Sequence, residues 1–172
     1  CDWNGTRRGR WGRQPDEAGG GHFLSTGGLE AGMDYRRVEG GREYVARLEH
    51  GGDWRGQIEA FAEEAGIDAA LFFGLGAVQD AAVFYYDQDD QEYYREEFDE
   101  PLEVTTALGN ISHLGDDLFA HTHATFSRAD GTMVGGHLDS GMVFAGEVYV
   151  RELDTHLERE HDEVTDLDLW PL

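Results

Sequence analysis

Three of the eight histidines lie within one short stretch, and their spacing suits a metal site. The stretch runs from Leu118 to Asp139 and contains His121, His123 and His137. His121 and His123 are two residues apart, so on a β-strand their side chains point to the same face. Three neutral imidazoles with an open fourth position form a common zinc arrangement, in which the metal activates water or a carbonyl group.

A tight turn between these histidines would bring all three together. Asp130-Gly131 indicates such a turn, because glycine readily adopts the left-handed conformation that short hairpins need. If the loop has three residues and Gly131 is left-handed, Arg128 faces Thr132. Counting back from this pair places His123 opposite His137. We therefore predict a zinc site on one face of the hairpin; a solvated strand with half-buried polar histidines is the alternative.

Charged residues near the histidines could complete such a site. A carboxylate usually orients a metal-bound imidazole, and Asp139 and Glu147 are the candidates for this role. Arg128 or Arg151 could hold the anionic group of a substrate. The pair Gly135-Gly136 predicts a β-bulge, which would let a backbone or ligand approach closely and could shift the register of His137.

The composition indicates one folded domain with a strongly acidic surface. Of 172 residues, 36 are acidic and 13 are basic, the basic ones are all arginine, and the net charge is -23. Such a charge can indicate disorder, but 12% of the residues are aromatic and apolar runs are frequent. We predict a protein of a halophile, because high salt screens the repulsion between surface carboxylates.

The remaining composition predicts a cytoplasmic protein. The single cysteine, Cys1, cannot form an internal disulfide. No apolar run is long enough to span a membrane, and no signal-peptide pattern is visible.

Residues 1–32 differ from the rest of the chain. They contain nine glycines and little apolar periodicity, which predicts a disordered or non-native arm ahead of a domain at residues 33–172. Within the arm, Arg8-Gly9-Arg10 looks like part of a degraded AT-hook, an element that binds the minor groove of A·T-rich DNA. A chance basic patch is the alternative interpretation.

The elements that must position the histidines are mostly strands. Alternation from Arg42 to Glu49 predicts a first strand, and Asp53 is a suitable N-cap for an amphipathic helix that Gly66 ends. Besides the histidine hairpin, further strands are predicted at residues 69–78, 80–86, 92–98, 102–112 and 142–153. These patterns predict an α+β domain, in which one or two helices flank a mainly antiparallel sheet.

The C-terminal tail is harder to interpret. Leu157, His161 and Val164 could mark a short helix, although acidic residues crowd the segment, and Trp170 is expected to pack back on the sheet. The other histidines are expected to be ordinary loop or surface residues. Among them His113 could lie beside the hairpin, because it ends the strand that precedes it.

Several motifs resemble one known family, the plant-and-prokaryote-conserved (PPC) domain, over residues 44–169. Its most specific match is the His-x-His pair at His121 and His123, followed by Gly135-Gly136-His137-Leu138. Further matches are Gly74-Leu75-Gly76-Ala77-Val78, Leu108-Gly109-Asn110-Ile111-Ser112, Asp130-Gly131, Gly141 and Glu152-Leu153.

The resemblance implies an α+β fold that assembles as a homotrimer. Plant members carry AT-hooks before the domain and act as DNA-binding regulators. Free-standing prokaryotic members are described as predicted DNA-binding proteins. The fold is also similar to acetolactate decarboxylase, whose zinc is held by a His-x-His pair and a later histidine. Those positions correspond here to His121, His123 and His137.

Two functions therefore remain in view, and a third interpretation is that the histidines bind a metal only to hold the trimer or the hairpin, without chemistry. One is a trimeric DNA-associated or regulatory scaffold with a three-histidine metal site. The other is a zinc-dependent lyase or hydrolase that acts on a small acidic or carbonyl substrate. This chain lacks a proper AT-hook, and residues 33–172 hold nine arginines against 32 acids, which disfavours binding to phosphates.

Overall fold

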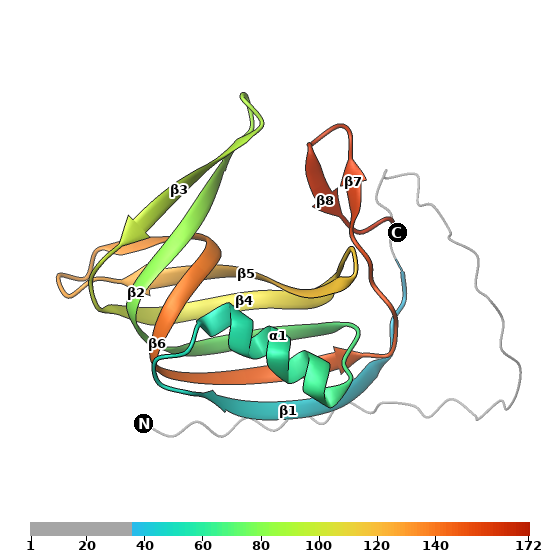
Figure 1. Ribbon diagram of the computed structural model, residues 1–172, viewed down its shortest axis with the longest axis horizontal. Coiled ribbons are helices and arrows are strands. Elements are labelled where there is room, and N and C mark those ends of the chain that lie inside the picture. Colours follow the sequence, from blue (N-terminus) through green and yellow to red (C-terminus); the bar gives the residue numbers. More distant parts are fainter. Residues whose placement is uncertain (1–35) are drawn as a thin grey trace, which may run out of the picture. The chain divides into compact units, whose positions relative to one another are not determined.

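The computed structural model describes residues 36–172, which contain one helix and eight strands (Figure 1). The predicted arm at residues 1–32 lies outside the described residues. The elements are β1 (Gly40–Leu48), α1 (Trp54–Ala65), β2 (Ala70–Asp87), β3 (Glu92–Phe98), β4 (Leu102–Leu114), β5 (Asp117–Ser127), β6 (Met133–Leu153), β7 (Glu160–Asp162) and β8 (Leu167–Leu169). The mainly antiparallel α+β fold is confirmed. No helix in this described part is long and apolar enough to cross a membrane.

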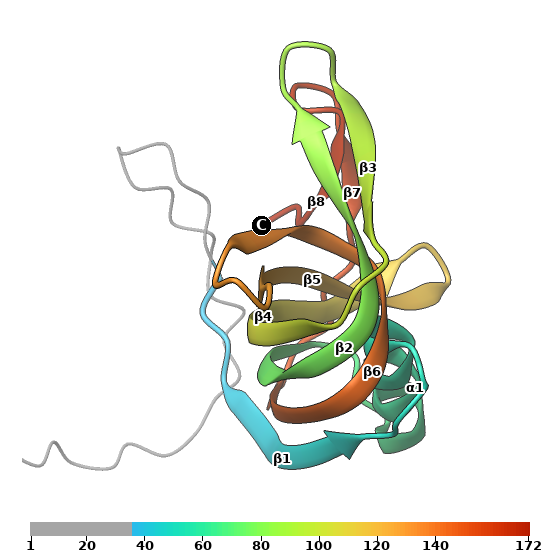
Figure 2. The ribbon, with the colours of Figure 1, turned by 90° about the vertical axis from the view of Figure 1, so that its left-hand side faces the viewer.

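The six-stranded sheet closes on itself through its two longest strands. Its order is β1-β6-β5-β4-β2-β3, and β6 pairs with β2 in addition to β1 and β5. Strands β2, β4, β5 and β6 therefore form a closed ring, and the sheet is strongly curved (Figure 2). Buried side chains from the strands and the helix fill the space inside the curvature.

Helix α1 begins and ends where its sequence predicts. The side chain of Asp53 accepts a hydrogen bond from the backbone N–H of Gly56 at 2.8 Å, which is the usual N-cap contact. Gly66 is left-handed and ends the helix. Trp54 and Ile58 are 1% and 2% exposed, so this face of the helix anchors it to the sheet.

In two places, two strands predicted as separate form one continuous strand in the structure. Residues 69–78 and 80–86 belong to β2, and the second strand of the histidine hairpin continues into residues 142–153 as β6. The strands bend at shifts in register, where turns were predicted to end them. One of them skips Asp139, because Ala82 pairs with Ser140 and Val83 with Leu138.

The predicted register of the β5–β6 hairpin is confirmed. Gly131 has φ +82°, and Arg128 and Thr132 close the loop through a backbone hydrogen bond of 2.9 Å. His123 pairs with His137, as the count along both strands predicts. The bulge expected at Gly135-Gly136 was wrong, because both glycines pair regularly with β5. Their lack of a side chain instead permits close backbone contact, since a Cβ at Gly135 would lie 2.2 Å from the carbonyl oxygen of Ala124.

The C-terminal tail forms a small hairpin, β7–β8, and the helix suggested for it was wrong. The Asp162 carboxylate accepts hydrogen bonds from the N–H and hydroxyl of Thr165, and Asp166 has φ +56°, which makes a turn where a helix would have to continue. Before this hairpin the tail lies along β4. The N–H of His113 donates a hydrogen bond to the Leu157 carbonyl, and the N–H of Arg159 donates one to the His113 carbonyl.

The β2–β3 and β7–β8 hairpins extend from the same side of the curved sheet (Figures 1 and 2). They contact each other near their tips. The Tyr86 hydroxyl donates to the Thr165 carbonyl at 2.7 Å, and the Gln91 amide donates to the Val164 carbonyl at 3.2 Å. Residues of both hairpins line one pocket.

Candidate metal centre

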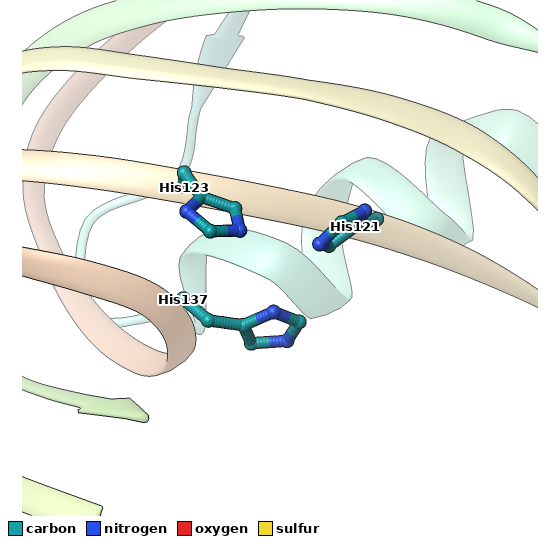
Figure 3. A group of neighbouring side chains, drawn as sticks. All are labelled: His121, His123 and His137. Atoms are coloured by element: carbon teal, nitrogen blue, oxygen red, sulfur yellow. The ribbon is translucent and has the colours of Figure 1, made fainter. Parts of the chain in front are cut away.

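The three predicted histidines point toward one another (Figure 3). His121 and His123 project from β5 and His137 from β6. One nitrogen of each ring lies within 4.8 Å of the corresponding nitrogens of the other two, and the ring centroids are 4.9–5.4 Å apart. A small shift of each ring would bring all three nitrogens to a single zinc ion, which binds imidazole nitrogen at about 2.0–2.1 Å.

Alternation along β5 explains why these side chains are free to form a site. Ala120, Thr122, Ala124 and Phe126 are buried in the core, whereas Phe119, His121 and His123 occupy the intervening positions. The histidines therefore lie on the face of the strand that turns away from the core. The cross-strand pair of His123 and His137 then adds the third imidazole to this face.

Burial keeps two of the imidazoles neutral. It lowers the pKa of His121 to about 3 and the pKa of His137 to about 4, and positive charge from Arg159 and neighbouring imidazoles acts in the same direction. A neutral imidazole has a free nitrogen lone pair, which is the form that binds a metal ion. The chemistry of this donor set therefore fits zinc.

A pocket of about 630 Å³ opens above the histidines. Its walls come from the two extended hairpins, from β5 and from the start of α1. The lining side chains are largely aromatic or aliphatic, with Phe84 and Tyr93 on one wall, Phe119 at the base, and Leu167 and Leu169 on the tail hairpin. The histidines thus form the polar part of an otherwise mainly apolar pocket, the usual composition of a small-molecule site.

Two arginines that the sequence reasoning did not select also line this pocket. Arg55 projects from α1 and Arg159 from the tail, and their guanidinium carbons lie 5.4 Å and 5.8 Å from the centre of the Phe119 ring. Neither residue stood out, because Arg55 reads as the polar side of a helix and Arg159 lies in an acidic tail without periodicity. A tertiary contact alone brings Arg159 to the histidines.

Arg159 is held entirely by neutral acceptors. Its guanidinium donates to the Ser112 hydroxyl at 3.1 Å, the Asp168 carbonyl at 2.9 Å and the Asn110 side-chain oxygen at 2.8 Å. It also lies 3.1 Å from Nδ1 of His121. Among the described residues no carboxylate forms an ion pair with it. Burial lowers the pKa of Arg159 from its ordinary value.

The structure separates the other charged candidates from the histidines or engages them elsewhere. Asp139 accepts a hydrogen bond from Arg95 at 2.7 Å, and Glu147 pairs across the sheet with Arg47 and lines a different depression. Arg128 forms an ion pair with Glu100 at 2.9 Å, and Arg151 lies 3.9 Å from Glu43. Glu147, Arg128 and Arg151 do not line the histidine pocket, and the roles suggested for them stay predictions.

A second group with metal-binding donors lies on the tail side of β4. It consists of Asp68, His113 and His156, whose donor atoms also lie within 4.8 Å of one another. His113 Nε2 is 3.3 Å from a carboxylate oxygen of Asp68, and the two imidazole rings are 4.5 Å apart. Asp68 and His156 are exposed, so this group is open to solvent. It matters for any measurement of metal content.

A family comparison agrees with the fold and the histidine pattern. The profile of the Plants and Prokaryotes Conserved (PCC) domain, the family abbreviated PPC above, matches residues 35–154. The chain belongs to this family. No curated protein matches the chain.

Several solved structures are similar to this chain over almost their whole length. A metal-containing protein from Archaeoglobus fulgidus is 43% identical, with a TM-score of 0.77 over 80% of this chain and 99% of that chain. A PPC protein from Pyrococcus horikoshii is 28% identical, with a TM-score of 0.76 over 81% and 98%. A candidate DNA-binding protein from Bacteroides thetaiotaomicron, 23% identical with a TM-score of 0.71 over 77% and 96%, shares the fold.

Proposed function

We propose that this PCC-domain protein binds zinc through His121, His123 and His137 and uses the metal to bind a small molecule. The observation that carries this proposal is the convergence of three imidazoles at the base of a pocket. The pocket has the size and the apolar walls of a ligand site, and its polar groups are concentrated in one place.

The nature of the ligand atoms favours zinc over calcium and magnesium. Three nitrogen donors without a carboxylate or thiolate suit zinc, whereas calcium and magnesium require oxygen ligands. The metal-containing protein from Archaeoglobus fulgidus, which is 43% identical, supports a metal in this chain.

The pocket suits a lyase or hydrolase acting on a small acidic or carbonyl substrate. Bound zinc would supply a Lewis acid with an open position for water or a substrate oxygen. Arg55 and Arg159 place positive charge beside that position, so they would orient an anionic group. Phe84, Tyr93 and Phe119 would limit the access of water, which strengthens the electrostatic interactions inside the pocket.

The metal proposal is tested by the metal content of tag-free protein purified without chelators. We expect about one zinc per chain at the histidine hairpin, and its loss in His123→Ala. Because Asp68, His113 and His156 could contribute a second equivalent, the matched control is His156→Ala, which should retain the zinc of the hairpin. Wild-type protein that binds no zinc even after equilibration with the metal would refute the proposal.

Association with DNA is the second candidate, supported by the structural neighbour and by Arg8-Gly9-Arg10 in the arm. The described domain is unfavourable for it, because acids outnumber arginines and most of its arginines are paired with carboxylates. Binding to A·T-rich duplex at several salt concentrations, with and without residues 1–32, separates the candidates. Binding that requires the arm would favour the DNA-associated function.

We further propose that the protein forms a homotrimer in the cytoplasm of a halophile. Exposed apolar side chains support self-association. Val45, Tyr149, Phe73 and Leu108 follow one another across β1, β6, β2 and β4, and Val45, Phe73 and Leu108 are 87%, 53% and 61% exposed. A contiguous exposed apolar patch of this kind usually marks an interface. The net charge of -23 supports adaptation to high salt, which predicts that the unfolding temperature rises with potassium chloride concentration.

A further inference from the structure

The contact between Arg159 and His121 cannot persist once a metal occupies His121. An arginine side chain can only donate hydrogen bonds, so at 3.1 Å Nδ1 of His121 must be the acceptor and the proton must reside on Nε2. If a metal binds Nδ1, it uses the same lone pair. If a metal binds Nε2, the proton moves to Nδ1, which then becomes a donor. In both cases Arg159 loses this acceptor.

The freed donor would remain inside the pocket. The contacts of Arg159 with Ser112, Asn110 and the Asp168 carbonyl do not involve His121, so they continue to hold the guanidinium in place. The free N–H would lie beside the metal-bound imidazole and within the pocket that contains the metal's open position. Arg159 is half-buried, and a charged N–H that has lost its acceptor there is available to an incoming anion.

We propose that metal binding breaks the hydrogen bond from Arg159 to His121, and that the freed N–H of Arg159 then donates to a carboxylate coordinated at the metal. The metal and the carboxylate therefore bind cooperatively. This inference rests on the proposed zinc site and specifies its ligand. Neither the metal nor the carboxylate needs to displace an acidic side chain, because Arg159 has no ion-pair partner among the described residues.

Charge and shape favour a small monocarboxylate over a phosphate. Three neutral imidazoles leave the metal's charge uncompensated, and Arg159 adds one positive charge with few free donors. A phosphate would require several more donors than the pocket offers. Phe84, Tyr93 and Phe119 provide contact for an apolar group next to the carboxylate. Arg55 also lines this wall, but its Nε lies 3.3 Å from a carboxylate oxygen of Glu59, so Arg159 is the arginine available to the carboxylate.

The test uses the full chain loaded with Co²⁺, whose visible spectrum reports ligands at a three-nitrogen site, and acetate as the probe. Wild-type protein is compared with Arg159→Gln and with the control Arg128→Gln, which removes an arginine outside the pocket. We expect acetate to bind wild type and the control alike, and to bind Arg159→Gln at least about tenfold more weakly, as expected for a lost charged hydrogen bond.

A second measurement distinguishes this role from general damage to the site. Without acetate, Arg159→Gln should bind Co²⁺ more tightly than wild type, because a competing hydrogen bond and a nearby positive charge are both removed. Acetate should raise the Co²⁺ affinity of wild type by the same factor by which Co²⁺ raises its acetate affinity, and this coupling should be lost in the variant. Arg159→Lys, which keeps the charge but not the planar fork, should also lose most of the coupling.

Equal acetate affinity in wild type and Arg159→Gln, or absence of acetate binding to Co²⁺-loaded wild type, would overturn the inference. In both cases the metal proposal would still hold if wild-type protein binds Co²⁺ and His123→Ala does not. Absence of bound metal from wild type would instead remove the proposed function on which the inference rests.

Discussion

The neutral state of His121 and His137 has a consequence for the metal-free protein in acid. Their pKa values of about 3 and about 4 in the folded chain lie below the value of about 6.5 expected when the chain unfolds. Their effect on stability is absent above pH 6.5. As the pH falls from about 6.5 toward about 4, the unfolded chain binds protons that the folded chain does not, so these histidines lower the free energy of unfolding.

We therefore expect the metal-free protein to lose stability between about pH 6.5 and pH 4. The measurement is the free energy of unfolding by urea over this range. Replacement of both His121 and His137 by asparagine should flatten the dependence, whereas His161→Gln, an exposed histidine on the tail hairpin, should leave it unchanged. A double variant with the wild-type pH dependence would contradict the assignment.

Residue types and spacing were sufficient to find the histidines but not the arginines. The three histidines lie within 17 consecutive residues on either side of a glycine turn. The turn of a β-hairpin fixes which residues pair across its strands, so the spacing of the histidines predicts how they face one another. Arg159 reaches His121 across 38 residues, through a tail whose path depends on hydrogen bonds to β4. No local pattern encodes that path, and closeness in sequence does not bring Arg128 or Arg151 to the histidines, because they lie beside Glu100 and Glu43.

At the scale of elements, the caps of α1 and the hairpin turn were predictable because each depends on a few neighbouring residues. The continuity of β2 and β6 was not, because glycines and polar residues inside them resemble turns. These glycines and polar residues lie in strands that bend with the sheet. The register of β2 against β6 shifts at three places, and the strands bend there without ending. The tail was misread because Asp162 and Thr165 form a turn within an acidic segment.

The hairpin that holds the histidines depends on close packing at Gly135. A Cβ there would lie 2.2 Å from the carbonyl oxygen of Ala124 on β5. We expect Gly135→Ala to separate the two strands and to lower the free energy of unfolding by about 1–3 kcal/mol, measured in urea. Zinc affinity should fall as well, because His123 and His137 lie on these strands.

The matched control for this change is Gly141→Ala on the same strand. Its Cβ would lie 3.4 Å from Val78, an ordinary contact distance, so the free energy of unfolding should change by less than about 0.5 kcal/mol. Equal effects of the two substitutions would show that close packing at Gly135 is not what holds the strands together.

At the scale of the whole molecule, the exposed apolar row and the acidic charge act in opposite directions on association. The row of Val45, Tyr149, Phe73 and Leu108 promotes contact between copies, whereas a charge of -23 on each chain opposes it. Salt removes the repulsion and strengthens apolar burial, so assembly should be favoured at high ionic strength.

We expect light scattering in high salt to give about three times the chain mass of 19.2 kDa. Phe73→Glu places a charge in the centre of the row and should reduce the mass to that of one chain. Val164→Glu changes a residue that is 83% exposed on the tail hairpin and should leave the assembly intact. A variant Phe73→Glu that retains the wild-type mass would place the interface elsewhere.

The closure of the sheet by β6 also sets the order in which the chain can fold. Ala70 in β2 must find Glu152 in β6, a partner about eighty residues away, whereas His123 and His137 are joined by one short loop. Contacts between distant residues form slowly, and short hairpins form within microseconds. The histidine hairpin is therefore expected to form before β6 closes the sheet, so under the proposed function zinc added at the start of refolding would meet all three histidines while most of the core is still open.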